Sequence, residues 1–183
     1  MKKDPRIEKV LYTREEVESK IKELADWVNE QYKDTDELVI IGLLKGSIPF
    51  LSRLMMDVTV DMSIDFMTVS TYDGGVNSSG NVKVVMDLKR DIEGKDILIA
   101  EDIIDSGITL KKVKEQLEKR NPKSLKILTL MDKPSGRAVK LHADKVGLKV
   151  PDAFLVGYGL DVKEKMRNIP YIGIFDKNKI DEV

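Results

Sequence analysis

Residues 101–109 bring acids, hydroxyl groups and a glycine together directly after an apolar run, and they read EDIIDSGIT. A glycine-containing loop offers backbone N–H groups to a phosphate, and serine and threonine hydroxyls add further donors. Carboxylates can face ribose hydroxyls or a hydrated cation. Glu101 and Asp102 are adjacent on an extended backbone, so they point to opposite sides and are poorly placed to share one metal ion. The pattern predicts a site for a phosphorylated sugar.

A strand and a helix must position this stretch. Residues 97–100 are all apolar and follow a turn-like segment, which predicts a central strand buried on both faces of a parallel sheet, with the acids directly after it. The segment LKKVKEQLEKR, after Thr109, has helical composition. Ligands of open parallel sheets bind at the carboxyl ends of the strands. The acids and the loop should therefore lie at that edge.

The other expected elements give an α/β fold. Thr13 and Glu16 form a capping box, which predicts a helix with an apolar stripe behind it. Strands are expected at 37–44, 60–69, 82–88, 125–131, 153–158 and 171–175. A polar segment from Ser70 to Asn81 predicts a flexible loop between antiparallel strands, which could serve as a lid. We expect one domain over residues 1–183: a central parallel sheet flanked by helices, with a small hood of short strands.

Composition excludes several classes of protein. The chain has 183 residues, no cysteine, and 31 basic against 32 acidic residues, for a net charge of −1. This balance gives no overall attraction to nucleic acid, and no stretch is apolar enough to span a membrane. The beginning of the chain has no apolar signal region, and disulfides and thiolate metal sites are excluded. We therefore expect a cytoplasmic protein with neither a nucleic-acid nor a membrane partner.

Two lysines follow other expected strands. Lys45 lies beside Gly46 after residues 37–44, and Lys133 follows residues 125–131. Both should lie at the carboxyl edge, where Lys45 could bind an anion; the alternative is a solvated loop lysine. His142 is the one histidine, and no carboxylate or serine pattern around it indicates catalysis.

The stretch 101–109 resembles the phosphoribosyl pyrophosphate (PRPP) signature of type I phosphoribosyltransferases. Nearly the whole chain is similar to the hypoxanthine–guanine branch of that family. The resemblance implies that PRPP contacts Glu101, Asp102, Ile104, Asp105, Ser106, Gly107, Ile108 and Thr109. Lys45, Gly46 and Arg167 are implied to bind pyrophosphate, and the peptide between Leu44 and Lys45 is commonly cis in that branch. Thr71 and Tyr72 would begin a flexible catalytic loop.

The same resemblance implies a purine site and a metal. Lys133 would read the purine 6-oxo group, Phe154 would stack on the base, and the backbone of Leu155 would bind its edge. Glu101, Asp102 and Asp161 are the implied acids for Mg²⁺. Two departures are mild: Ile108 stands where some members carry lysine, and Thr71 stands where many carry serine.

The implied activity is purine salvage. The 5-phosphoribosyl group of PRPP would pass to hypoxanthine or guanine, giving the nucleoside monophosphate and pyrophosphate, with Asp105 as the catalytic proton acceptor. We expect 6-oxopurines to be preferred over adenine, and a homodimer or homotetramer. Two alternatives are a PRPP-sensing regulator on the same fold and a sister enzyme that prefers xanthine.

Overall fold

The computed structural model describes residues 3–71 and 82–183, with the side chain of Thr71 left out. Its elements are β1 (Ile7–Tyr12), α1 (Arg14–Gln31), β2 (Leu38–Leu43), α2 (Ser47–Leu54), β3 (Met62–Thr71), β4 (Val82–Met86), β5 (Asp96–Ile104), α3 (Ile108–Glu118), β6 (Ser124–Asp132), β7 (Lys145–Lys149), β8 (Leu155–Val156) and β9 (Ile172–Phe175), with short 3₁₀ turns η1 (Pro134–Gly136) and η2 (Lys177–Glu182). Within these residues, no helix has the length and apolar character needed to cross a membrane.

The central sheet has six strands in the order β4-β3-β2-β5-β6-β7. All neighbouring pairs are parallel except β3 and β4, which run antiparallel. Residues 97–100 of β5 are fully buried between β2 and β6. The predicted α/β fold and its central buried strand are confirmed.

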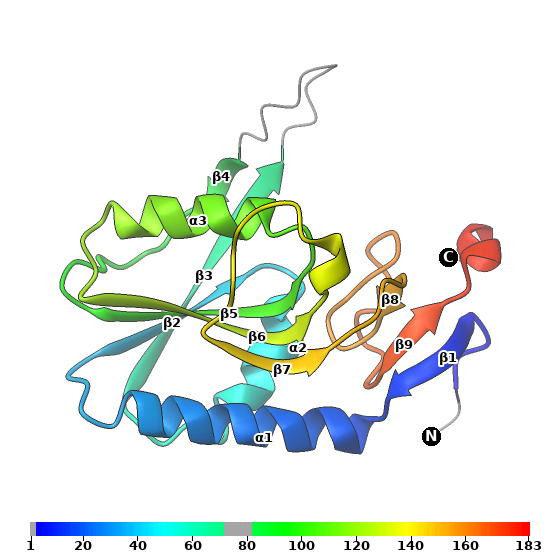
Figure 1. Cartoon of the computed structure of the whole chain (residues 1–183), viewed down its shortest axis with the longest axis horizontal. Coiled ribbons are helices and arrows are strands. Elements are labelled where there is room, and N and C mark those ends of the chain that lie inside the picture. The colour runs from blue at the N-terminus through cyan, green and yellow to red at the C-terminus, as the bar shows by residue number, and fades with distance from the viewer. Residues whose placement is uncertain (1–2, 72–81) are drawn as a thin grey trace.

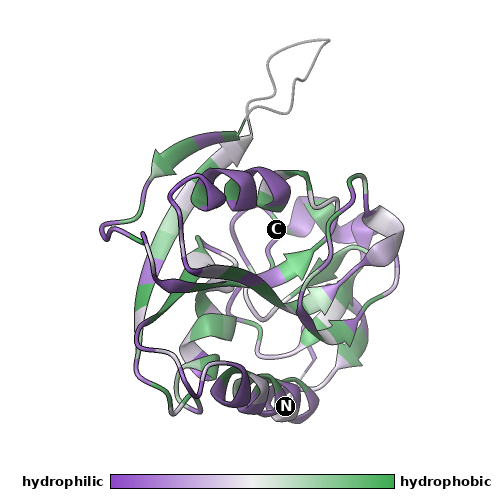
Figure 2. Ribbon diagram, turned by 60° about the vertical axis from the view of Figure 1, so that its left-hand side comes forward, coloured by the Kyte–Doolittle hydropathy of each residue, from purple (hydrophilic) through white to green (hydrophobic). Residues whose placement is uncertain are grey.

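Helices cover both faces of this sheet (Figure 1). The buried side chains of α1 and α2 pack against one face, and those of α3 pack against the other. Helix α1 begins after the predicted capping box, because the side chain of Thr13 accepts from the Glu16 N–H and the Glu16 side chain accepts from the Thr13 N–H. Figure 2 shows hydrophilic residues along the outer surfaces of α1 and α3. The helices are therefore amphipathic covers, as their periodicity predicts.

A second sheet forms the hood, with the order β1-β9-β8. It is antiparallel and has its own apolar cluster, which includes Ile7, Val156, Tyr171 and Phe175. The hood was expected from the later short strands, but β1 supplies one of its edges. The sequence IEKVLY did not indicate β1, because two charged residues interrupt its apolar residues. In the structure, β1 pairs with β9 through two register irregularities.

Two further strands differ from their expected boundaries, and one strand was not expected. Strand β5 continues through the acids to Ile104, because β6 pairs alongside it as far as Asp132. The strand expected at 153–158 is only β8, since Gly157, Tyr158 and Gly159 adopt positive φ and turn the chain. Strand β7 was missed: it is a short edge strand with lysine at both ends.

Candidate active site

The phosphate side of the site is a small cavity at the carboxyl end of β5. Its volume is about 190 Å³, and it is lined by Leu43, Glu101, Ile103, Ile104, Asp105, Ser106, Gly107, Thr109 and Leu110. Helix α3 begins here at Ile108, and Gly107 before it has a φ of 76°. The N–H groups of a first helical turn have no partners within the helix, so they can bind an anion. Most of the residues expected to bind PRPP therefore surround one cavity.

Glu101 and Asp102 face different surroundings within β5. Glu101 is 7% exposed, and its Oε1 atom has no hydrogen-bond partner among the described residues. Burial, and then the charge of Asp102, raise the pKa of Glu101 well above its usual value. Burial also raises the pKa of Asp102 to about 6, although Ile103 N–H donates to its Oδ1 atom at 2.7 Å. Both acids are held in positions that disfavour their charge in the absence of a ligand.

Gly46 brings the loop after β2 against Asp102. A Cβ atom on Gly46 would lie 1.8 Å from Asp102 Oδ2, so only glycine allows this approach. The hood touches the same loop, since a Cβ atom on Gly159 would lie 2.0 Å from the Gly46 carbonyl oxygen. The peptide bond between Leu44 and Lys45 is cis, as the resemblance predicted.

Lys45 and Arg167 meet at Glu164, which the sequence reading did not single out. Lys45 Nζ lies 2.7 Å from Glu164 Oε2, and Arg167 donates to Glu164 Oε1 at 3.0 Å. Arg167 also contacts Asp161 Oδ1 at 2.9 Å and donates to the Gly159 carbonyl at 2.8 Å. The hydrogen bond from Lys45 is the largest of the effects that lower the pKa of Glu164. Two cations thus converge on one acidic side chain.

Lys133 and Asp105 form an ion pair at the neighbouring strand ends. Lys133 Nζ lies 2.9 Å from Asp105 Oδ2 and 3.4 Å from Asp152 Oδ1. The hydrogen bond to Asp105 is the largest influence raising the pKa of Lys133, so this side chain carries its charge at neutral pH. Asp105 is half exposed, whereas Lys133 is 13% exposed. The Lys133 side chain is therefore mostly buried, and its ammonium group lies between two carboxylates.

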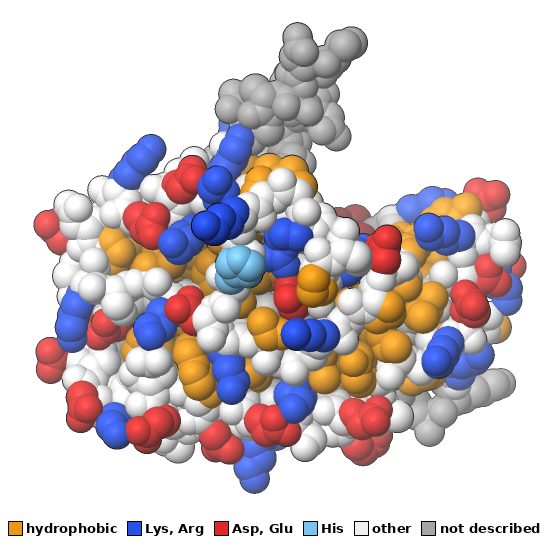
Figure 3. Space-filling model, in the orientation of Figure 1, with side chains coloured by type: hydrophobic (Ala, Val, Ile, Leu, Met, Phe, Trp, Pro, Cys, Tyr) orange, Lys and Arg blue, Asp and Glu red, His pale blue; other side chains and the backbone are white. Residues whose placement is uncertain are grey.

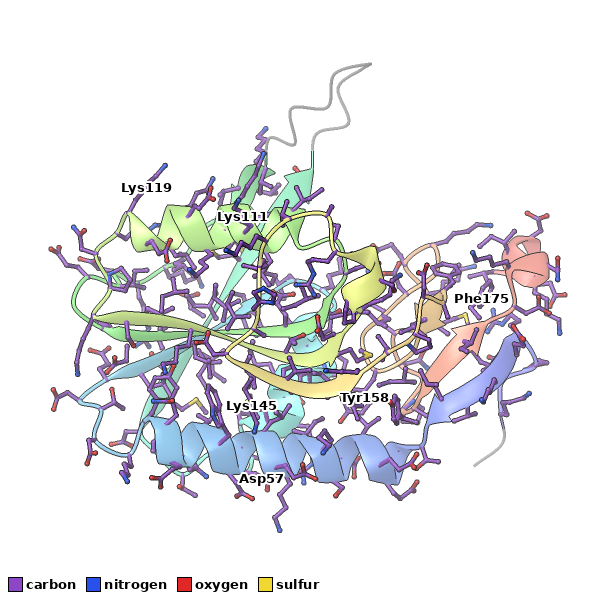
Figure 4. The ribbon with its side chains drawn as sticks, viewed as in Figure 1. Asp57, Lys111, Lys119, Lys145, Tyr158 and Phe175 are labelled. Carbon is purple, nitrogen blue, oxygen red and sulfur yellow. The ribbon has the colours of Figure 1, made fainter. Side chains whose placement is uncertain are left out.

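A larger cavity of about 610 Å³ opens beside Lys133, and its walls come from separate parts of the chain. Its lining residues are Lys133, Asp152, Ala153, Phe154, Lys177 and Ile180. Phe154 is 36% exposed, and its ring packs edge-on against Phe175 with centroids 5.5 Å apart. Figure 4 labels Phe175, on β9 of the hood. Leu155 is buried and pairs with Ile174. The expected purine-binding side chains thus line, or lie next to, one cavity.

Arg137 supports the loop that carries Asp105, a role that was not expected from the sequence. It donates to the carbonyl oxygens of Asp105 at 3.0 Å and Leu141 at 2.6 Å, and it forms an ion pair with Asp132. Its only signal was its position four residues after Lys133, in the loop that follows β6. Arg137 ties the ends of β5 and β6 together.

The remaining expected residues are less informative. Among the described residues, no three acids or histidines converge as a metal cluster, so Glu101, Asp102 and Asp161 do not form one. The flexible loop was expected to begin at Ser70, but Ser70 and Thr71 belong to β3, because they pair with β4. The rest of the expected loop, with Tyr72, lies outside the described residues. His142 is exposed, and histidine is pale blue in Figure 3. The expectation that it takes no part in the reaction stays a prediction.

Comparison with known proteins agrees with this geometry. Residues 9–163 match the family model described as the phosphoribosyl transferase domain. The chain is 52% identical over 168 residues to the hypoxanthine-guanine phosphoribosyltransferase of Bacillus subtilis, covering 92% of this chain and 93% of that protein. It is 47% identical to the hypoxanthine phosphoribosyltransferase of Escherichia coli, covering 90% and 93%.

Solved structures show the same likeness. A crystal structure of a hypoxanthine phosphoribosyltransferase from Staphylococcus aureus superimposes with a TM-score of 0.91 at 45% identity, covering 94% of each chain. The match extends over both the central sheet and the hood, since so much of each chain is covered. The chain therefore belongs to the phosphoribosyltransferase family, in its hypoxanthine–guanine branch.

Proposed function

We propose that this protein transfers the 5-phosphoribosyl group from PRPP to hypoxanthine or guanine, as part of purine salvage. The observation that carries the proposal is the position of Asp105 between two cavities. It lines the smaller one, and its carboxylate lies 2.9 Å from Lys133 Nζ, which lines the larger one. A phosphate-binding loop and a purine pocket that share one acid fit a reaction joining a sugar phosphate to a base.

The proposed chemistry asks little covalent work of the protein. The purine nitrogen forms a bond to the anomeric carbon of PRPP while the bond to pyrophosphate breaks, with inversion through an oxocarbenium-like state. Asp105 accepts or holds the proton at purine N7, and Lys133 donates to the 6-oxo group as charge develops there. Phe154 stacks on the base. Lys45 and Arg167 neutralise the leaving pyrophosphate, which requires them to release Glu164.

Mg²⁺ is the proposed cofactor. Magnesium is usually bound by one or two carboxylates together with substrate phosphates and water, so a ready-made cluster of three acids is not required. Asp102, Asp161 and Glu101, whose Oε1 atom has no hydrogen-bond partner among the described residues, would suit a hydrated cation or ribose hydroxyls. When bound, the ion supplies positive charge to the leaving group.

The family resemblance also supports three broader parts of the proposal. The chain would act as one domain of residues 1–183, would assemble as a homodimer or homotetramer, and would work in the cytoplasm.

The direct test is product formation from PRPP and hypoxanthine with Mg²⁺. We expect inosine monophosphate and pyrophosphate in equal amounts, identified by chromatography. A preparation that binds PRPP but forms neither product with hypoxanthine or guanine would contradict the proposal.

A further inference from the structure

Lys133 has one more carboxylate partner than the proposed reaction uses. Its ammonium lies 2.9 Å from Asp105 Oδ2 and 3.4 Å from Asp152 Oδ1. Asp105 has a role at purine N7, whereas Asp152 has none in the reaction described above. Asp152 also raises the pKa of Lys133, after the larger effect of Asp105. The second acid therefore calls for its own explanation.

The two carboxylates reach Lys133 from different parts of the fold. Asp105 belongs to the loop between β5 and α3, while Asp152 lies just before β8 and lines the same cavity as Lys133 and Phe154. The ammonium group thus bridges the central sheet and the hood. A movement of Lys133 away from Asp105 would leave it beside Asp152.

The proposed reaction weakens the pair between Lys133 and Asp105. Asp105 must also accept from purine N7, and Lys133 must also donate to the 6-oxo group, for which its ammonium group has three N–H donors. A side chain that is only 13% exposed loses much of its hydration, and a charge without a partner there is costly. A second carboxylate lets Lys133 leave Asp105 without losing its counter-charge.

We propose that Asp152 is a positioning residue, which holds Lys133 toward the 6-oxo group while Asp105 serves purine N7. This inference rests on the proposed function, and it adds a residue that determines base choice through Lys133. The competing explanation is an ordinary surface ion pair, because the Asp152 side chain is 74% exposed and such pairs contribute little. An ordinary pair would leave base choice unchanged.

The test compares four variants with the native enzyme: Asp152→Ala, Asp152→Asn, Lys133→Ala and the double variant Asp152→Ala with Lys133→Ala. The measured quantities are kcat and KM for hypoxanthine and for adenine. Asp181→Asn is the matched control, since it removes one exposed carboxylate from η2, beside a wall of the same cavity. Thermal melts check that every variant is folded.

We expect Asp152→Ala to lower kcat/KM for hypoxanthine by about 5–10-fold and to narrow its lead over adenine. Asp152→Asn should recover part of this loss, because its amide oxygen still accepts a hydrogen bond. In the Lys133→Ala background, Asp152→Ala should lower kcat/KM for hypoxanthine by less than about a further twofold. The effects of two substitutions are not additive when one residue acts through the other. The control should behave as the native enzyme does.

Two results would overturn the inference: an unchanged ratio between the two bases in Asp152→Ala, or a full additional loss in the double variant. If the native enzyme converts hypoxanthine normally, either result would leave the proposed function intact. Failure of the native enzyme to use hypoxanthine or guanine would instead overturn the proposed function, and with it the role given to Asp152.

Discussion

The two halves of the candidate site are built in different ways. The phosphate side comes mainly from one continuous stretch, residues 101–109, at the end of the central strand β5. The purine side is assembled from Lys133 after β6, residues 152–154 before β8, and Lys177 and Ile180 of η2. The first is positioned by backbone that belongs to the main sheet. The second depends on side-chain contacts between that sheet and the hood.

The charges of the two halves also differ. On the phosphate side, Glu101 is buried, its Oε1 atom has no partner in the part of the chain that the structure describes, and its pKa is raised. The three cations expected to meet substrate, Lys45, Arg167 and Lys133, already contact carboxylates. Ligand binding should therefore satisfy buried acids on the phosphate side only, and replace existing ion pairs on both sides. Substitutions can separate these two effects.

The largest expected effect comes from Asp105, where the halves meet. Asp105→Asn should lower kcat by about 10²–10⁴-fold, because it removes a positioned proton acceptor. PRPP binding should change little, since the cradle at residues 106–109 remains. Steady-state kinetics together with calorimetric titration of PRPP measure both quantities. A variant that keeps nearly native kcat would remove Asp105 from the catalytic role.

The next effect should be confined to the purine side. Lys133→Ala should lower kcat/KM for hypoxanthine and guanine by about 10–100-fold and narrow their lead over adenine, as expected for the loss of a hydrogen bond from a charged donor. Lys133→Gln should also narrow the lead of hypoxanthine and guanine over adenine. It should cost adenine less in kcat/KM, because the glutamine amide can both donate and accept a hydrogen bond. Parallel kinetics with the three bases provide the measurement. An unchanged ratio would mean that the lysine serves only its ion pairs.

A smaller effect is expected from Gly46 on the phosphate side. A Cβ atom there would lie 1.8 Å from Asp102 Oδ2, so Gly46→Ala forces the loop and the acid apart. Overpacking of this kind costs about 1–3 kcal/mol. We expect KM for PRPP to rise by about tenfold, which corresponds to about 1.4 kcal/mol of that cost. The hypoxanthine to adenine ratio should stay native. A changed ratio with a normal KM for PRPP would show that the two halves are not separable.

The smallest effect concerns stability and pH. The pKa of Asp102 is raised from 3.8 to about 6, so the fold binds more protons than the unfolded chain between these values. The carboxylate therefore costs stability above about pH 6, and this cost disappears as the pH falls toward 4. Asp102→Asn should raise the ligand-free Tm at pH 8 by at least about 2–4 °C, the shift that each 1 kcal/mol gives in a chain of this size, and have little effect at pH 4. Melting curves at both pH values decide this, and equal shifts would contradict it.

The sequence predicted the phosphate side better than the purine side, for a physical reason. A buried strand, a glycine loop and a helix are consecutive, so local patterns place Asp105 and Gly107 without knowledge of the rest of the fold. The contact of Lys133 with Asp152 joins residues on two different sheets, and no periodicity encodes it. The strand before Lys133 placed this lysine at the carboxyl edge, but the purine-binding roles of Lys133, Phe154 and Leu155 came from family resemblance alone.

The same reasoning explains the errors in the fold. Strands β2 and β6 are apolar and largely buried, and their positions were predicted closely. Strand β5 was found where it was expected, but it continues past Ala100 through the two acids to Ile104. Strands β1 and β7 are short edge strands with charged residues, so composition did not indicate them. Arg137 and Glu164 act through loop contacts that appear only in three dimensions.

The most direct test of the account is the ratio of kcat/KM for hypoxanthine and adenine in the native enzyme. Adenine presents a 6-amino donor to Lys133, so two donors would face each other at a lysine side chain that is only 13% exposed. Discrimination built on hydrogen bonds can reach roughly 10⁴-fold. We predict that hypoxanthine is strongly preferred, with PRPP saturating and Mg²⁺ present. Equal kcat/KM values for the two bases would contradict the assignment of Lys133 and of the purine side of the site.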